Sequence, residues 1–236
     1  MKKFTALALA LGLSVSAFAC LTAWDNAITD PPSVDTEVSK EEFVAAFTLG
    51  ENYVCTADVV FSGLGIQRWQ FKRADNLLES CIHYLNDDYT PLEGQHATYN
   101  FVEKVEDKVY YYTPNTNQDG TVNYYTKEQR TETFEYYEYD DLGALLMPLF
   151  TDIDLYTYNA ETAAYEAANV VISDTMSASN LSWKFVNNKL VAGSYTMINS
   201  QSTDATQMPV NFTITYGNAT ITLPTNVQGW GGKNFT

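Results

Sequence analysis

The chain has 236 residues and a formal net charge of −16, with 29 acidic against 13 basic side chains. Such a negative balance argues against nucleic acid and anionic membrane surfaces as partners, because both would repel the protein. The acidic residues are dispersed and aromatic residues are plentiful, which argues against a disordered chain. The length suits one domain with a sizeable core.

The first twenty residues have the pattern of an export signal. Two lysines precede a mostly apolar run over 4–18, and the sequence Ala-Phe-Ala precedes Cys20. This pattern predicts a secretory signal peptide over residues 1–19. The run is shorter than the roughly 20 apolar residues that a permanent membrane helix needs. Cys20 at the new N-terminus predicts a bacterial lipoprotein, held on the outer face of a membrane by acyl chains on that residue. The alternative is ordinary cleavage that leaves an unmodified cysteine.

Residues 20–38 are expected to form the lipidated N-terminus and a tether, because they contain a Pro-Pro pair among small polar residues. Loss of the two leader lysines would change the formal charge from −16 to −18. Ser39 and Glu42 have the spacing of a capping box, in which each side chain satisfies a backbone N–H of the other residue. Apolar residues follow at helical spacing. The sequence therefore predicts a short amphipathic helix over 39–49.

From Tyr53 onward the apolar residues recur with a period of two, the pattern of strands with one buried face. The segment 77–85 fits a strand, although its apolar residues also fit helical spacing. A second, apolar helix is predicted over 140–150, with Pro148 kinking or ending it. The predicted strands are 53–61, 67–72, 77–85, 98–105, 108–113, 121–128, 131–139, 153–158, 164–172, 181–186, 189–199, 209–216 and 219–223.

These elements predict an α+β fold, mostly antiparallel β, with one domain over 39–224. A single sheet of about ten antiparallel strands would curl, because each added strand contributes twist. Two helices with apolar stripes would fill the hollow. The sequence therefore predicts a strongly curved sheet, or half-barrel, with two short helices on its concave face. Residues 225–236 are glycine-rich and are expected to form a flexible C-terminal tail.

This organisation resembles the lipoprotein-carrier superfamily, the half-barrel proteins that include lipoprotein localisation factors and lipid-binding lipoproteins. The resemblance covers residues 39–224. It implies that lipid or acyl chains are held between the sheet and the helices. Carriers that ferry lipoproteins are usually not lipidated, so Cys20 fits a membrane-tethered relative better. The features that carry the resemblance are the signal peptide with Cys20, the capped helix at 39–49, the hairpins from 53 onward, the apolar helix at 140–150 and the closing segment 211–224.

The aromatic-rich interior is the main functional candidate. Side chains on the inward parity of the strands, or on the second helix, could line an incompletely filled cavity that binds a lipid or another hydrophobe. The alternative is a fully packed core. The residues concerned are Trp69, Phe71, Phe101, Leu145, Leu146, Leu149, Trp183 and Phe185.

Cys55 and Cys81 make an even pair in an exported chain, where they could form a disulfide. The alternative is two buried thiols. Histidine chemistry has little support, since neither His83 nor His96 falls in a triad or metal-binding spacing. His83 is expected to be a partly buried structural residue, and His96 an exposed loop residue.

Carboxylate pairs such as Glu135 and Glu138 are expected to be solvated faces of strands rather than a glycosidase site. The sequence therefore predicts a monomeric, non-enzymatic lipoprotein without metal or cofactor, which binds a lipid or another hydrophobe and reaches the membrane through Cys20. One alternative is a surface module that binds carbohydrate or a protein partner with a packed core. A hydrolase is a distant third hypothesis and would need an acid pair in a cleft.

Overall fold

The computed structural model describes residues 38–229 except 62, 144, 147 and 201–205. All of these belong to one compact unit, Asp35–Thr236. The predicted signal peptide, Cys20 and nearly all of the predicted tether lie outside the described residues, as does the end of the predicted tail at 230–236.

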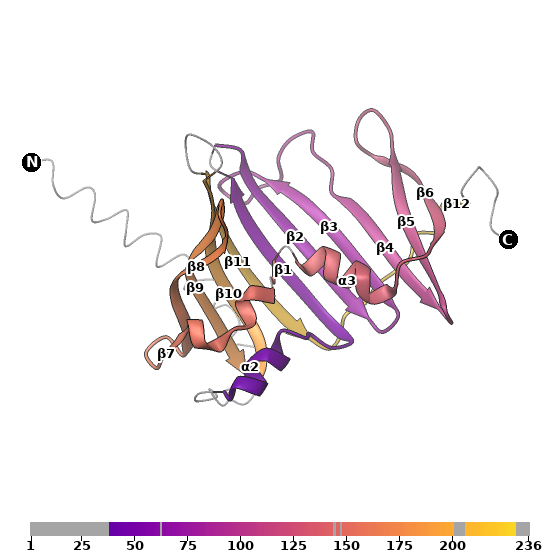
Figure 1. Ribbon diagram of the computed structural model, residues 1–236. Helices are drawn as coiled ribbons and strands as arrows, with labels where there is room; N and C mark the ends of the chain where they lie inside the picture. The colour runs from indigo at the N-terminus through magenta and orange to yellow at the C-terminus, as the bar shows by residue number, and fades with distance from the viewer. Residues whose placement is uncertain (1–37, 62, 144, 147, 201–205, 230–236) are drawn as a thin grey trace, which may run out of the picture. The chain divides into compact units, whose positions relative to one another are not determined.

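Most of the described chain forms one open, mostly antiparallel sheet of twelve strands (Figure 1). The strands are β1 (Asn52–Phe61), β2 (Gly65–Ala74), β3 (Leu77–Leu85), β4 (Thr98–Val105), β5 (Lys108–Thr116), β6 (Val122–Arg130), β7 (Thr157–Asn159), β8 (Ala164–Ser173), β9 (Met176–Val186), β10 (Lys189–Asn199), β11 (Thr206–Tyr216) and β12 (Val227–Gly229). Their order in the sheet is β12-β6-β5-β4-β3-β2-β1-β11-β10-β9-β8-β7. Two runs of hairpins, β1 to β6 and β7 to β11, therefore join where β11 pairs with β1. The sheet has more strands than the expected ten, and the parallel pairing of β12 with β6 departs from the antiparallel pattern.

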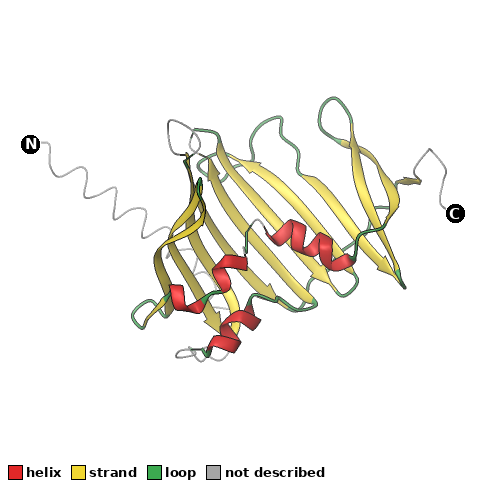
Figure 2. Ribbon diagram, in the orientation of Figure 1, coloured by secondary structure: helices red, strands yellow, loops and turns green. Residues whose placement is uncertain are grey.

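Helix α2 (Lys40–Ala46) begins with the predicted capping box. The Ser39 hydroxyl accepts a hydrogen bond from the Glu42 N–H at 3.2 Å, and the Glu42 carboxylate accepts one from the Ser39 N–H at 2.8 Å. The helix stops at Ala46 and is shorter than predicted. Phe43 and Ala46 of the predicted apolar stripe are buried and Phe47 packs against the core, whereas Val44 is 44% exposed. Figure 2 shows the helix beside the sheet.

The predicted strand over 131–139 is wrong, because helix α3 (Phe134–Gly143) occupies most of it. Alternating Tyr and Glu residues gave this segment a strand-like pattern. In the structure Phe134 and Tyr137, which are three residues apart, lie on the same side of a helix and pack against the sheet. Contacts with the sheet thus outweigh the local preference.

The predicted helix over 140–150 is correct only at its start. After α3 ends, the chain turns, and Pro148 begins the short 3₁₀ helix η1 (Pro148–Thr151). Proline is well tolerated at the first position of a helix but not in its interior. A second 3₁₀ helix, η2 (Ile153–Leu155), and β7 replace the predicted strand over 153–158.

Both helices lie against the same face of the sheet, which we call the helical face; the other is the back face (Figure 1). The main core lies between the helical face and α2, η1 and the end of α3. A smaller core lies under Phe134 of α3, against Leu78, Val102 and Val109.

The C-terminal segment 217–226 covers part of the back face. The Ala219 N–H donates to the Asn52 side chain beside β1, and the Asn226 carbonyl accepts from the Tyr125 N–H on β6. The segment therefore crosses the four strands between β1 and β6, and Figure 1 shows it passing behind them. The predicted strand over 219–223 is wrong, since this stretch has no ladder pairing. The predicted loose tail is wrong at 227–229, which form β12.

Two surface loops have the same five-residue construction, with the sequences NDDYT at 86–90 and NQDGT at 117–121. In each loop the first and last residues exchange a backbone hydrogen bond of 2.8 Å, and the third-position aspartate accepts from the threonine hydroxyl at 2.6 Å. The fourth residue has a positive φ in both: 66° at Tyr89 and 84° at Gly120. Glycine adopts this conformation freely, whereas tyrosine is strained there.

Candidate functional site

An apolar cavity of about 100 Å³ lies on the helical face, partly open to solvent. It sits between strands β1, β2, β10 and β11 and the turn that follows α3. Every lining side chain is apolar apart from the hydroxyl of Tyr195 and the indole N–H of Trp69, which donates to the Gln67 side chain at 3.1 Å. The lining residues are Val59, Phe61, Trp69, Leu145, Tyr195, Met197, Met208 and Val210.

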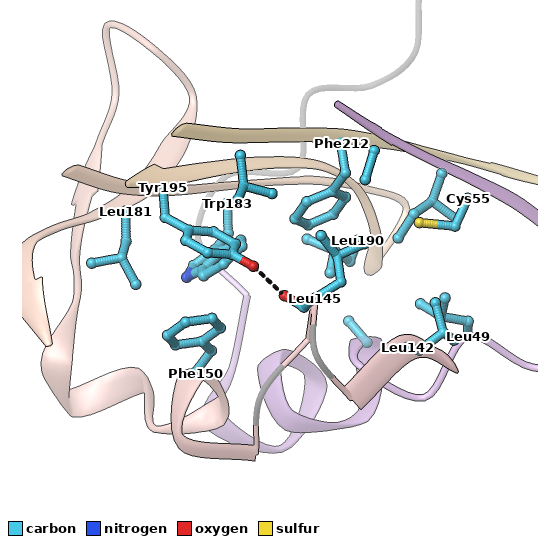
Figure 3. Packing of buried hydrophobic residues seen from close by; sticks show 14 of the residues in the cluster. Leu49, Cys55, Leu142, Leu145, Phe150, Leu181, Trp183, Leu190, Tyr195 and Phe212 are labelled. Atoms are coloured by element: carbon cyan, nitrogen blue, oxygen red, sulfur yellow. Dashed lines mark hydrogen bonds between the residues drawn. The ribbon is translucent and has the colours of Figure 1, made fainter. Parts of the chain in front are cut away.

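The roof of the cavity is Leu145, in the turn after α3. The backbone N–H groups of Leu145 and Leu146 both donate to the Leu142 carbonyl, at 2.8 and 2.7 Å. The Tyr195 hydroxyl donates to the Leu145 carbonyl at 3.0 Å, as Figure 3 shows. Burial raises the pKa of Tyr195, so its hydroxyl stays protonated as a donor. The Tyr195 hydroxyl is therefore already used to hold the roof in place, and the Trp69 N–H is used by Gln67.

The floor comes from three neighbouring strands, β1, β10 and β11, of which β1 is far from the other two in the sequence. Met197 lies directly opposite Met208, and Val210 lies between Val59 on β1 and Tyr195 on β10. Methionine is unbranched and polarizable, so paired methionines can adapt their shape to different apolar groups. The floor thus favours apolar ligands without selecting one shape.

An apolar surface continues from the cavity across the helical face to β3. Trp69 lies directly opposite Ile82, and Gln67 lies opposite Tyr84. Trp69, Ile82 and Tyr84 are all only partly buried. A hydrophobic chain that entered the cavity would therefore have a path along these side chains.

The cavity contains two of the eight residues that the sequence predicted for it, Trp69 and Leu145. Three others, Phe71, Trp183 and Phe185, belong to the packed core on the same face, and Leu146 packs against that core. Figure 3 shows Trp183 beside Phe150 and Phe212 in the tightly packed part of the cluster. The side chain of Leu149 lies outside those that the structure describes.

Phe101 lies on the wrong face for the predicted cavity. It is directly opposite Glu79 and Tyr112, whose strands place them on the back face. It is 6% exposed and packs edge-on against Tyr125. Its apolar parity was read correctly as a buried position, but the back face is also buried here.

Sequence reasoning missed six residues that line the cavity. The alternation over 53–61 predicted that Val59 and Phe61 would point inward, and the other four belong to β10 and β11. What the sequence did not show is that β11 pairs with β1, which brings residues about 150 positions apart to one place. These residues are Val59, Phe61, Tyr195, Met197, Met208 and Val210.

Cys55 and Cys81 are separate buried thiols, so the possible disulfide is not formed. Strand β2 lies between their strands, which places the two Cα atoms about 10 Å apart, beyond the reach of a disulfide. Burial raises the pKa of Cys55 to about 12, and chiefly burial raises the pKa of Cys81 to about 11. Both thiols therefore stay protonated at neutral pH.

The possible catalytic groups are engaged in separate contacts. Glu138 pairs with Arg73 at 2.5 Å, whereas Glu135 pairs with Lys104 at 3.6 Å. His83 is partly buried and lies 3.2 Å from the Cys81 sulfur. Burial, followed by the nearby charges of Arg68 and Lys72, lowers the pKa of His83. The prediction that His83 is partly buried is confirmed.

His96 is exposed in a loop, as predicted. Within the described ranges, no three His, Cys, Asp or Glu side chains gather in a way that could hold a metal ion.

A polar group joins α3 to the sheet beside the main core. The Glu138 carboxylate accepts from the Tyr53 hydroxyl at 2.8 Å and from Arg73. The guanidinium of Arg73 also lies over the ring of Phe134, 5.4 Å from its centre. Burial, and then the charge of Glu138, raises the pKa of Tyr53. These contacts set the position of α3, and hence of the roof that follows it.

A second polar group lies on the back face. The Glu103 carboxylate accepts from Lys127 at 2.8 Å and from the Tyr112 hydroxyl at 2.6 Å. Burial acts to raise the pKa of Glu103, but these hydrogen bonds and the charge of Lys127 outweigh it, and the pKa is lowered.

Comparisons with models of known protein families and with curated proteins find no match to this chain. Among the helices in the described part of the chain, none combines the length and apolar character needed to cross a membrane.

Proposed function

We propose that this protein is an exported lipoprotein that holds the end of an alkyl chain in the cavity beneath Leu145. The observation that carries the proposal is a partly open, mainly apolar cavity whose two polar side-chain groups, on Tyr195 and Trp69, are already hydrogen-bonded. Such a site offers nothing to a polar ligand and costs nothing in unmet hydrogen bonds when an alkyl group enters.

The size of the cavity limits the ligand. Pockets that enclose a drug-sized molecule usually measure about 300–1,000 Å³. A cavity of about 100 Å³ suits only the end of a chain. The remaining length of the chain would lie along Trp69, Ile82 and Tyr84, where uncharged side chains favour a neutral alkyl segment over an ionised headgroup.

The proposal includes a curved, half-barrel sheet and a lipid anchor on Cys20. The open, mostly antiparallel sheet with both helices on one face supports the proposed likeness to lipid-binding lipoproteins. The leader sequence supports export and the anchor. We propose a monomer with a non-enzymatic role. Cys20→Ala should release the protein from membranes into the soluble fraction, and retention of that variant would contradict the anchor.

The binding proposal is tested with 1-octanol as the probe and with ¹³C-methyl methionine labels in the full chain. Octanol should shift the signals of Met197 and Met208, which line the cavity, and leave the signal of Met176, which packs elsewhere against the core. Equal shifts at all three methionines, or none, would overturn the proposal.

Two variants separate binding from folding. Leu145→Ala removes the roof side chain and should change the affinity for octanol. Leu142→Ala is the matched control, because Leu142 is a buried leucine at the end of α3, three residues before Leu145, that does not line the cavity. Both should lower stability by about 2–5 kcal/mol, and only Leu145→Ala should alter the octanol titration.

A second candidate is a surface module that binds carbohydrate. Tyr136 and Tyr139 are 49% and 60% exposed on α3, and exposed tyrosine rings can stack on sugars. Binding of the protein to a glycan array, abolished by Tyr139→Ala, would favour this function over the alkyl-binding one.

A further inference from the structure

The two edges of the sheet differ in how much of the edge strand is paired on its outer side. The edge strand β6 is paired with β12 over Tyr125–Lys127, and Asn226 binds the same edge at its backbone and side chain. At the other edge, β7 pairs with β8 only over 164–166. Within the described part of the chain, no strand pairs with the outer side of β8 over 167–173.

In the described part of the chain, no element covers the open stretch of β8, although its ladder with β9 is irregular between Val171 and Ser173. Its sequence, AANVVIS, contains no charged residue and no proline. Val171 is 66% exposed, and Ala168 and Asn169 are exposed as well. Natural sheet edges are usually blocked by lysine, proline or a covering element, because their free N–H and C=O groups bind other strands. This edge is therefore available to an added strand.

The backbone of the same stretch is already held in an extended conformation by its pairing with β9. On its inner side β8 pairs with β9 as far as Ser173, and Val170 and Ile172 contact the main core. A partner strand would thus meet a backbone that loses little further freedom. Strand addition gains affinity from main-chain hydrogen bonds and specificity from the flanking side chains.

The flanking side chains are acidic at both ends. Glu166 precedes the open stretch, and Asp174 follows it in the turn to β9. A second copy paired antiparallel about Val170 would bring its Asp174 next to Glu166, whose own outer edge is paired with Thr157 of β7. Two chains that each carry a net charge of −16 would add to this repulsion. The charges therefore disfavour a second copy and favour a partner with basic ends.

We propose that the outer edge of β8 over 167–173 binds an extended segment of another protein, neutral in its centre and basic at both ends. The segment would pair with β8 over 167–173, on the same edge as β7 and just beyond the end of β7. Lysine or arginine at its ends would lie near Glu166 and Asp174. This site is separate from the cavity under Leu145 and does not depend on it.

The test uses the full chain and three synthetic nine-residue peptides. The first has seven alternating threonine and valine residues between terminal lysines, the second has glutamates in place of the lysines, and the third has the lysines and a central proline. The lysine peptide should bind and slow amide hydrogen exchange in 167–173. The other two should bind at least about tenfold more weakly. The glutamate peptide has the wrong charge beside Glu166 and Asp174, and the proline peptide lacks a backbone N–H for strand pairing.

Two protein variants locate the binding. Val171→Lys places a charge on the open edge and should lower the affinity for the lysine peptide at least about tenfold. Val105→Lys, at a 44% exposed valine of β4, is the matched control and should leave binding unchanged.

Three results would overturn the proposal: no binding of the lysine peptide, equal binding of the glutamate peptide, or protection that maps outside 167–173. Concentration-dependent dimers of the full chain that Val171→Lys abolishes would also overturn it, because the occupant would then be a second copy.

Discussion

Replacement of Gly193 by alanine should destabilise the protein by a steric effect that the structure defines closely. Gly193 lies in β10, directly opposite Trp183 on β9 and Phe212 on β11. A Cβ atom at this position would lie 2.5 Å from Phe212 Cζ and closer still to Trp183 Cε3. Real Cβ atoms essentially never approach other heavy atoms within 3.0 Å. Both rings, or the backbone of β10, would have to move.

Neither ring has space to move. Trp183 is fully buried and Phe212 is 3% exposed. The Trp183 ring also contacts Phe150 and Tyr195, at centroid distances of 5.3 and 6.0 Å, so its displacement would disturb the whole cluster (Figure 3).

The expected magnitude follows from two opposed effects. Forcing an extra methyl group into a packed core costs about 1–3 kcal/mol, and the double ring contact favours the upper end. Replacing glycine by alanine returns about 0.4–1 kcal/mol through the unfolded chain. The net loss should be about 2 kcal/mol, which for a chain of this size lowers Tm by about 4–8 °C.

Chemical denaturation and calorimetry of Gly193→Ala provide the measurement. Ser194→Ala is the control, because it creates the same residue at the next position of β10, and it should change the free energy of unfolding by less than about 0.5 kcal/mol. Phe212→Leu in the Gly193→Ala background should cost less than it does alone, since it makes room for the methyl group. Additive losses, or an unchanged Tm for Gly193→Ala, would refute the steric argument.

Three further predictions test contacts outside the cavity. Glu138→Gln leaves the largely buried Arg73 without its counter-charge and should lower the free energy of unfolding by about 2–3 kcal/mol in chemical denaturation; no loss would show that the contact does not hold α3. The pKa of Glu103 is lowered in the folded protein. Its contribution to the free energy of unfolding is therefore complete above the unfolded-state pKa of about 4.3 and is lost as the pH falls through the folded-state pKa. Stability measured from pH 6 to pH 3 should fall less steeply in Glu103→Gln, and equal slopes would contradict this. Tyr89→Gly removes a strained positive φ and should stabilise the protein by up to about 1 kcal/mol in thermal unfolding, whereas Gly120→Ala at the equivalent loop position should destabilise it; effects of the same sign would contradict the loop comparison.

The strands could largely be predicted because one face of the sheet is covered by helices and the sequence alternates accordingly. The segment from Tyr53 to Phe61 has the expected alternation, with buried residues at every second position. The capping box at Ser39 is equally local, since both partners lie within four residues. Such features depend only on residues close together in the sequence, so they can be predicted without knowledge of the fold.

Errors arose where distant contacts decide the outcome. Phe134 and Tyr137 are three residues apart, so a helix lets both pack against the sheet at Leu78, Val102 and Val109. The local sequence does not reveal this distant contact surface. Phe101 was assigned to the cavity because its burial was read as burial against the helices.

The path of the C-terminal segment after Gly217 is a second feature that distant contacts decide. Asn218 has a positive φ, as a hairpin turn requires, yet the chain there leaves the sheet and crosses it.

The position of α3 also explains why the cavity is small. Because α3 starts at Phe134 rather than at 140, the apolar side chains of its first turn, Phe134 and Tyr137, cover β3 to β5, away from the joint between β1 and β11, and only its last turn, with Leu142, reaches the main core. Only the turn after α3 reaches that joint, and it contributes the single side chain of Leu145 instead of a full helical stripe. One leucine can cover a floor of methionines and valines without filling it. The space left for a ligand is therefore set by the contacts of Glu138 and Phe134 at the other end of the helix, and a change there should alter the cavity without touching its lining.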